Sequence, residues 1–403
     1  MRVQIRIFTT ATAVAVVMVT LAACSSGAGS DSSYTSSPTI NIGWLSDQTG
    51  AAAIAGIPNL NGAQLAVSQI NAQGGVLGKQ LKLNVADEAC KPQTSVAAAR
   101  KFLEDSNTFM LVGGSCSEDA LAVKTVADKA KVPFLVDSAS SPALANPVSP
   151  YVYTSNILTN DEANFAAKSS ISKFHPKRLG VIYVANDYGQ GGATSVESAA
   201  KNANIDVVSK VQIPVDTTNY SSYLLPLKES APDTTVVVVY DVPSFLKQAK
   251  QLGIKTNFVF FSSATLRSAV VPMAEAGVLS GITTTFTTPT PMSTTSTSKP
   301  MAEFVTAYKA KYNKFPDSAD LNGYQSIYIV KTAVEKAGKV DRAKFLTAMD
   351  SFDNLDLGLT FPLHYSKTDH SGLSQMSLIT YNDNTAPGPD SLFGNGKLFV
   401  DAS

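Results

Sequence analysis

The sequence predicts an α/β protein made of two similar lobes. Short apolar runs alternate with segments of helical periodicity along most of the chain, which is typical of parallel sheets covered on both faces by helices. The chain has 403 residues, enough for about two domains that each bury a core. Apolar residues make up 44% and charged residues 16%, as in an ordinary globular protein slightly low in charge.

Residues 1–24 have the features of an export signal. Arg2 and Arg6 precede a mostly apolar run that is short for a bilayer-spanning helix of roughly 20 residues. The run ends in LAAC, which is similar to the lipobox of bacterial lipoproteins, where cleavage leaves the cysteine as a lipidated N-terminus. We expect lipid on Cys24 to anchor the protein to the outer face of the cell membrane, with 25–38 as a flexible tether. An ordinary secretory signal with an incidental cysteine is the alternative.

The charge balance gives no sign of a nucleic-acid-binding surface. Residues 1–23 hold two arginines and no acidic residue, so 30 basic residues face 32 acidic ones in the remainder. A chain without a basic excess is not expected to bind nucleic acid. The glycine-rich stretch 188–192 lacks the lysine of a phosphate-binding loop, and we expect no cofactor.

The first α/β unit begins at Thr39. Apolar runs predict strands at 39–45, 81–86, 109–112 and 133–136. Helices are expected between them, at about 60–70, 94–105 and 118–131. Ligands of parallel sheets bind beyond the carboxyl ends of the strands, a position that three loops should share: 46–58, 113–117 and 137–142. Two of these loops are rich in serine, which is compatible both with turn formation and with ligand contact.

The segment 110–119, MLVGGSCSED, is the strongest candidate for a ligand-binding turn. It reads as a strand, a tight Gly-Gly turn and the start of a helix. Ser115 stands three residues before Glu118, which is the spacing of a capping box, and two acidic residues follow Ser117. Free backbone N–H groups and hydroxyls at such a turn form a ready site for an anion. We therefore expect it to hold the carboxylate of a small ligand.

A second α/β unit follows from about residue 161. Its expected strands are 179–185, 207–213, 235–240 and 258–261. After the Thr/Ser/Pro-rich stretch 283–300, helices are expected at about 301–313, 322–338 and 341–350, and then a returning strand at 357–365. Because neither unit ends where the next begins, the units interleave. This order predicts two lobes with a cleft and several linking strands.

Three cysteines fit an exported protein. If Cys24 is lipidated, Cys90 and Cys116 remain and can pair in an oxidising compartment, although two buried free thiols are the alternative. The three histidines are scattered, and His364 and His370 with Asp369 are better explained as polar loop residues than as a metal site. No nucleophile elbow is present. We therefore expect neither an enzyme nor a bound metal.

Six short segments, in this order and spacing, resemble the periplasmic leucine/isoleucine/valine-binding family of ABC-transporter receptors. They are NAQGGVLG (71–78), DEAC (87–90), VAAARK (96–101), GGSCS (113–117), SASSP (138–142) and DYGQG (187–191). The resemblance runs from about Ile40 to the end of the chain. It implies the type I periplasmic binding fold, in which two Rossmann-like lobes joined by three crossover strands close over a small molecule.

The resemblance also implies roles for particular residues. In the family, the cysteines matching Cys90 and Cys116 form a disulfide. The hydroxyls matching Ser117 and Ser140, with backbone at Ser138, hold the ligand carboxylate. The tyrosine matching Tyr188 reaches the ligand from the far lobe.

The ammonium end of the site departs from the family pattern. The family's glutamate falls near Ser262, a far-lobe tyrosine near Asp241, and a first-lobe tyrosine near Ala55. An unpaired ammonium in a closed cleft would cost several kcal/mol. Either Asp241 supplies the counter-charge, or the ligand is an organic or aromatic acid without an amino group. Asp241 as a solvated helix cap is the structural alternative.

These observations predict a monomeric solute-binding lipoprotein that delivers a branched-chain amino acid or related carboxylate to a membrane permease. A ligand-sensing lobe for a membrane receptor is the alternative. The expected N-terminal lobe comprises 39–157 and 286–358, and the C-terminal lobe comprises 158–285 and 359–403.

Overall fold

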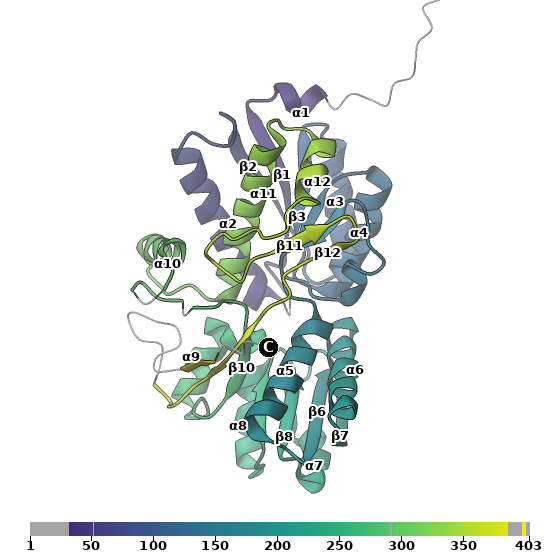
Figure 1. Ribbon diagram of the computed structural model, residues 1–403, viewed down its shortest axis with the longest axis vertical. Coiled ribbons are helices and arrows are strands. Elements are labelled where there is room, and N and C mark those ends of the chain that lie inside the picture. The colour runs from purple at the N-terminus through teal and green to yellow at the C-terminus, as the bar shows by residue number, and fades with distance from the viewer. Residues whose placement is uncertain (1–31, 51, 291, 296, 386–396, 400–403) are drawn as a thin grey trace, which may run out of the picture.

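The computed structural model describes residues 32–50, 52–290, 292–295, 297–385 and 397–399. They form two α/β lobes stacked along the long axis of the molecule (Figure 1). The predicted fold class is therefore confirmed. Within these residues, no helix combines the length and apolar character needed to cross a bilayer.

The N-terminal lobe is built on a five-stranded parallel sheet in the order β2-β1-β3-β4-β5. The strands are β1 (Thr39–Ser46), β2 (Gln80–Asp87), β3 (Thr108–Gly113), β4 (Phe134–Val136) and β5 (Val152–Thr154). The lobe's helices are α2 (Ala53–Ala72), α3 (Pro92–Glu104), α4 (Ser117–Ala130), α11 (Ser318–Ala337) and α12 (Arg342–Met349). Every residue of β3 is buried, because α2 and α11 cover one face of the sheet while α3 and α4 cover the other.

The C-terminal lobe holds a seven-stranded sheet in the order β14-β13-β10-β9-β8-β6-β7. Its parallel strands are β6 (Arg178–Val184), β7 (Asp206–Ile213), β8 (Thr234–Val238), β9 (Asn257–Phe260) and β10 (Thr283–Phe286). Antiparallel β13 (Ser377–Thr380) and β14 (Lys397–Phe399) extend the edge. The helices are α5 (Thr159–Phe174), α6 (Asp187–Asn202), α7 (Ser221–Ser230), α8 (Val242–Gln251) and α9 (Arg267–Glu275). Helices α5 and α6 share one buried cluster with β6, β8 and β9.

Three described segments connect the lobes: one after β5, one between β10 and α10 (Lys299–Tyr312), and one between β12 (Asp369–Gly372) and β13. Their described residues are irregular and do not form the expected strands. The boundary expected at residue 359 lies too early, because β11 (His364–Ser366) and β12 pack on the N-terminal lobe. The Tyr365 hydroxyl donates to the Thr154 carbonyl (2.8 Å), and the His370 ring stacks on Tyr153 with centroids 3.9 Å apart. His370 is therefore a buried packing residue and not a polar loop residue.

Several local predictions are corrected. The loop expected at 46–58 is helical from Ala53, because Gly56 lets the helix approach the end of β1: a Cβ there would lie 2.1 Å from the Asp47 carbonyl oxygen. The strand expected at 357–365 is reduced to His364–Ser366. Helix α11 starts at Ser318 and not at 322, because Asp317 and Asp320 form a capping box.

The expected tether 25–38 is structured over its described part. Ser32–Ser36 forms the short helix α1, and Tyr34 is 1% exposed. The Tyr34 ring packs edge-on against Phe109, and the Arg342 guanidinium lies 5.0 Å from its centroid. The expected signal segment 1–24, Cys24 and the first part of the tether lie outside the described residues.

Candidate ligand-binding site

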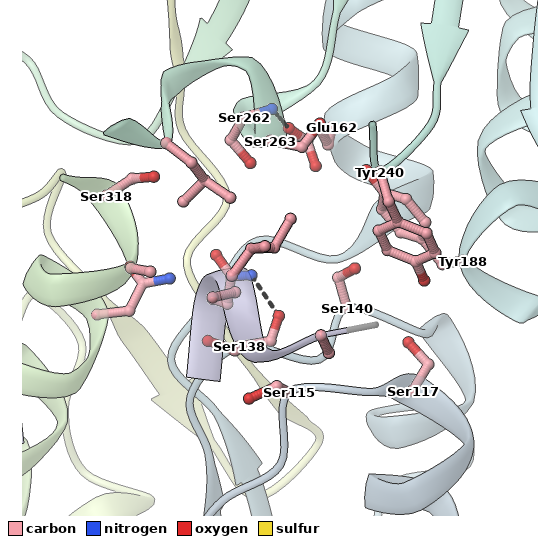
Figure 2. A pocket seen from close by; sticks show the side chains of 17 residues that line it. Ser115, Ser117, Ser138, Ser140, Glu162, Tyr188, Tyr240, Ser262, Ser263 and Ser318 are labelled. Atoms are coloured by element: carbon pink, nitrogen blue, oxygen red, sulfur yellow. Dashed lines mark hydrogen bonds between the residues drawn. The ribbon is translucent and has the colours of Figure 1, made fainter. Parts of the chain in front are cut away.

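A cavity of about 110 Å³ lies between the two lobes, at the carboxyl ends of their parallel strands (Figure 2). Serine side chains dominate its polar lining. They are Ser115, Ser117, Ser138 and Ser140 from the first lobe, Ser262 and Ser263 from the second, and Ser318 at the start of α11. Five side chains predicted from the sequence meet here: Ser117, Ser138, Ser140, Tyr188 and Ser262.

The first wall is the turn between β3 and α4. Gly113 has φ +122°, and a Cβ there would lie 1.9 Å from the Leu45 carbonyl oxygen, so the backbone approaches β1 as closely as glycine permits. Helix α4 begins at Ser117, and its N-cap residue, Cys116, makes no side-chain capping bond. The capping box expected between Ser115 and Glu118 is therefore wrong. The N-cap is Cys116 instead of Ser115, and this puts Ser117 in a first turn whose backbone N–H groups have no partner within the helix.

The second serine loop, after β4, is held by side chains of both lobes. The Asn59 amide donates to the Ser138 hydroxyl (2.9 Å), and the Asn156 amide donates to the Ser138 carbonyl (2.7 Å). The Ser140 hydroxyl lies 2.9 Å from the Thr159 hydroxyl at the start of α5. These bonds fix the loop before a ligand arrives, which reduces the entropy lost on binding.

Two tyrosines form the aromatic part of the far wall. The rings of Tyr188 and Tyr240 stack with centroids 5.6 Å apart, and Phe261 meets Tyr188 edge-on. The Asn186 amide donates to the Tyr240 hydroxyl (3.1 Å). Burial raises the pKa of Tyr188 well above its usual value and that of Tyr240 to about 12, so both are neutral phenols at neutral pH.

Glu162 is the carboxylate of this cavity, and sequence reasoning did not identify it. The side chain is 2% exposed, and its Oε1 accepts hydrogen bonds from the Ser262 backbone N–H (2.8 Å) and the Thr285 hydroxyl (2.6 Å) (Figure 2). Burial raises the pKa of Glu162, while these two hydrogen bonds favour the ionised form. The Ser262 hydroxyl also favours the ionised form of Glu162, and among the described residues no lysine, arginine or histidine forms an ion pair with this carboxylate.

Asp241 does not line this cavity. Its side chain accepts a hydrogen bond from the Ser244 backbone N–H (3.1 Å) and caps α8. The preceding residue, Tyr240, faces the ligand cavity instead. Ala55, where the family has a tyrosine, and Ser262, where it has the ammonium-binding glutamate, both line the cavity. Neither side chain is charged.

Cys90 and Cys116 form a disulfide, with Cα atoms 5.6 Å apart. The bridge ties the loop after β2 to the residue that precedes Ser117. Within the described residues, no cluster of potential metal ligands lines the cavity itself.

A preformed cleft between two α/β lobes, with polar groups converging from both, is the arrangement of a solute-binding protein. The periplasmic binding protein family matches residues 39–386, so the chain belongs to this family, as its short segments indicated. It is 27% identical over 330 residues to Leu/Ile/Val-binding protein homolog 7 of Brucella abortus, a match covering 79% of this chain and 82% of that protein. It is 29% identical over 222 residues to the Leu/Ile/Val-binding protein of Citrobacter freundii. That match covers 55% of this chain and 60% of the relative.

Solved structures share the fold. The branched-chain amino acid transporter substrate binding protein LivJ of Streptococcus pneumoniae, in complex with isoleucine, has a TM-score of 0.77 at 24% identity. The match covers 90% of this chain and all of that one. A solute binding protein of an ABC transporter from Rhodopseudomonas palustris, in complex with 3,4-dihydroxy benzoic acid, has a TM-score of 0.77 at 19% identity. That match covers 91% of this chain and 99% of the Rhodopseudomonas palustris chain.

Proposed function

We propose that this protein is the extracytoplasmic receptor of an ABC importer and captures a small aliphatic amino acid by closure of its two lobes. The observation that carries the proposal is the cavity's polarity. Serines and a helix N-terminus stand on the first lobe, and a single buried carboxylate, Glu162, stands on the second. A zwitterion presents complementary charges to these two walls.

The carboxylate end of the ligand is assigned to Ser117 and Ser140. The first-turn N–H groups of α4 supply donors and a positive dipole end, which favour an anion. Ser138 is held by two asparagines and shapes the loop, and its backbone is assigned to the ligand carboxylate.

The ammonium end is assigned to Glu162. An ionised carboxylate has lone pairs beyond those used by the Ser262 N–H and the Thr285 hydroxyl, and it can accept from an ammonium in a strong charge-assisted bond. Between the two ends, the cavity is lined by apolar side chains that suit a short aliphatic ligand: Ala52, Ile54, Ala55, Leu266 and Ala319.

A second candidate is a small acid without an amino group. The raised pKa of Glu162 supports it, because a protonated Glu162 would donate a hydrogen bond to a ligand hydroxyl or carbonyl. The stacked pair Tyr188 and Tyr240 would pack against an aromatic ring. The Rhodopseudomonas palustris neighbour holds such an aromatic acid.

Calorimetry on the purified protein separates these candidates. Leucine, isoleucine and valine are titrated alongside 4-methylpentanoic acid, which is leucine without its amino group, and 3,4-dihydroxybenzoic acid. Binding of the amino acids, with the deaminated analogue at least tenfold weaker, is expected from the lost charge-assisted bond. Binding of the deaminated acids alone would reverse the assignment, and binding of no carboxylate would remove it.

The importer role includes a lipid anchor at Cys24, a permease partner and a monomeric state. Substituting Cys24→Ala should release the protein from the membrane fraction. Deleting the gene should abolish uptake of the bound amino acid. Uptake that persists, together with an altered cellular response to the ligand, would favour the sensor.

A further inference from the structure

Three carboxylates lie together behind the first wall of the cavity, outside the site described above. Asp47 follows β1, Glu88 follows β2, and Asp119 lies in the first turn of α4. One oxygen from each lies within 4.8 Å of the others, and all three side chains are 0% exposed. A fourth buried acid, Asp137, follows β4 and interacts electrostatically with Asp47 and Glu88.

Most of the oxygens in this cluster have no partner. Asp47 Oδ1 accepts from the Cys90 backbone N–H (2.5 Å), and Asp119 Oδ2 accepts from the Ser95 hydroxyl (2.8 Å). Asp47 Oδ2, Asp119 Oδ1 and both oxygens of Glu88 are buried without a hydrogen bond. Among the described residues, no lysine, arginine or histidine forms an ion pair with them. Glu88 is therefore a wholly buried carboxyl group with no partner, facing two other carboxylates.

Burying several acids without compensation is costly, so a cation or shared protons must neutralise the cluster. Two features favour ionised carboxylates and hence a cation. The Cys90 N–H donates to Asp47, and Asp119 lies at a helix N-terminus, where the helix dipole stabilises negative charge. Oxygens that bind one Ca²⁺ at 2.3–2.6 Å are at most about 5 Å apart, which matches the cluster. The neighbouring Cys90 and Cys116 sulfurs are engaged in the disulfide, so the available donors are oxygens, which suit a hard cation.

We propose that Asp47, Glu88 and Asp119 form a Ca²⁺ site that supports the ligand-binding turn from behind. The ion would join the loop before α2, the disulfide-bonded loop after β2 and the first turn of α4. Ala52 in the first of these segments, Ile54 in the adjoining first turn of α2 and Ser117 in α4 all line the cavity. The site is independent of the identity of the transported ligand.

The test measures Ca²⁺ binding directly, without any transported solute. Protein stripped with a chelator is titrated with CaCl₂ at pH 7.5 by calorimetry, and its thermal midpoint is followed in parallel. One Ca²⁺ per chain and a raised midpoint are expected. Glu88→Gln, which conserves shape, should weaken Ca²⁺ binding at least about tenfold, because affinity follows the charge of the ligand set. Asp206→Asn, at an exposed acid on β7, is the matched control and should leave it unchanged.

The alternative is that protons hold the cluster together. In that case Ca²⁺ would neither bind stoichiometrically nor change the midpoint of the wild-type protein. In saturating CaCl₂ at pH 7.5, the midpoint of Glu88→Gln would equal or exceed that of the wild type. Either result overturns the proposal, and the wild-type titration stays decisive even if the variant fails to fold.

Discussion

Replacing Glu162 by glutamine is the most direct probe of how the cavity recognises its ligand. The amide oxygen of glutamine can still accept from the Ser262 N–H and the Thr285 hydroxyl, so the local structure should persist. What disappears is the negative charge that the proposed function pairs with the ligand ammonium. A hydrogen bond to a charged group contributes roughly 1.5–3 kcal/mol, and the full burial of Glu162 leaves little solvent to weaken it.

These values correspond to an affinity loss of about 10- to 150-fold for leucine, isoleucine or valine, at about 1.4 kcal/mol per factor of ten. Calorimetry at pH 7.5 measures the loss, and 4-methylpentanoic acid, which has no ammonium, provides the internal comparison. Its affinity should stay the same or rise in the variant. A uniform loss for both ligand types would refute the reasoning, because it would mean that Glu162 acts through the structure of the site and not through its charge.

Asp241→Asn is the matched control for the same experiment. Asparagine caps helices as well as aspartate does, so α8 should keep its N-cap and the protein its stability. Because Asp241 lies outside the cavity, amino-acid affinity should not change. A large loss here, with none in Glu162→Gln, would return the counter-charge to Asp241.

Three further outcomes follow from the geometry. Ser117→Ala should weaken the binding of amino acids and of deaminated acids alike, by about 10- to 150-fold in calorimetry, since a hydrogen bond to a charged carboxylate contributes roughly 1.5–3 kcal/mol. Gly113→Ala should lower the free energy of unfolding by more than about 1 kcal/mol in urea titration, because the new Cβ meets the Leu45 carbonyl at positive φ. The calcium-free protein should lose thermal stability as pH rises from 5 to 8. Burial raises the pKa of Asp119 to about 7 and that of Asp137 to about 8, so the folded state binds more protons than the unfolded state in that range. Unchanged affinity in Ser117→Ala would contradict the first expectation, and unchanged stability in Gly113→Ala the second. A thermal midpoint that rises with pH in the calcium-free protein would contradict the third.

The positions of the first-lobe serines at one edge of the sheet could be predicted because these residues follow strands. Ser117 and Ser140 come shortly after apolar runs, and parallel strands present their carboxyl ends at one edge. Gly113-Gly114 marked the turn in the sequence. The start of α4 was not fixed by the sequence: the predicted helix range begins at residue 118, and a capping box of Ser115 and Glu118 would start it at residue 116, whereas the helix begins at Ser117.

Glu162 could not be predicted from its local sequence. It lies in the first turn of α5, where acidic residues are common because they favour the helix dipole. The position of its carboxylate in the cavity depends on hydrogen bonds to residues 100 and 123 positions away, Ser262 and Thr285. Tyr240 and Asp241 show a different limit: they are adjacent after β8, and one faces the cavity while the other caps α8. A resemblance aligned to within one residue cannot separate them.

Tyr34 was missed for a compositional reason. It lies in a Ser-rich stretch that reads as a linker, and low-complexity composition predicts no buried side chain. The aromatic ring nevertheless finds Phe109 at the start of β3 and the Arg342 guanidinium on α12. A single tyrosine can therefore order the end of such a segment when the adjoining lobe offers an apolar face.

The hydrogen-bond donors near Ser117 and the carboxylate of Glu162 stand on different lobes, and this has a consequence for the proposed importer. A ligand shifts the balance between open and closed forms only through its preference for the closed form. An acid without an ammonium could occupy the donors near Ser117 on the first lobe, yet it would gain little from Glu162 when the second lobe approaches. An amino acid gains from both walls only when they are close together. If closure is what a permease recognises, the charge of Glu162 would select ligands at the step of closure as well as at the step of binding, so that carboxylates lacking an ammonium would bind without producing the closed form.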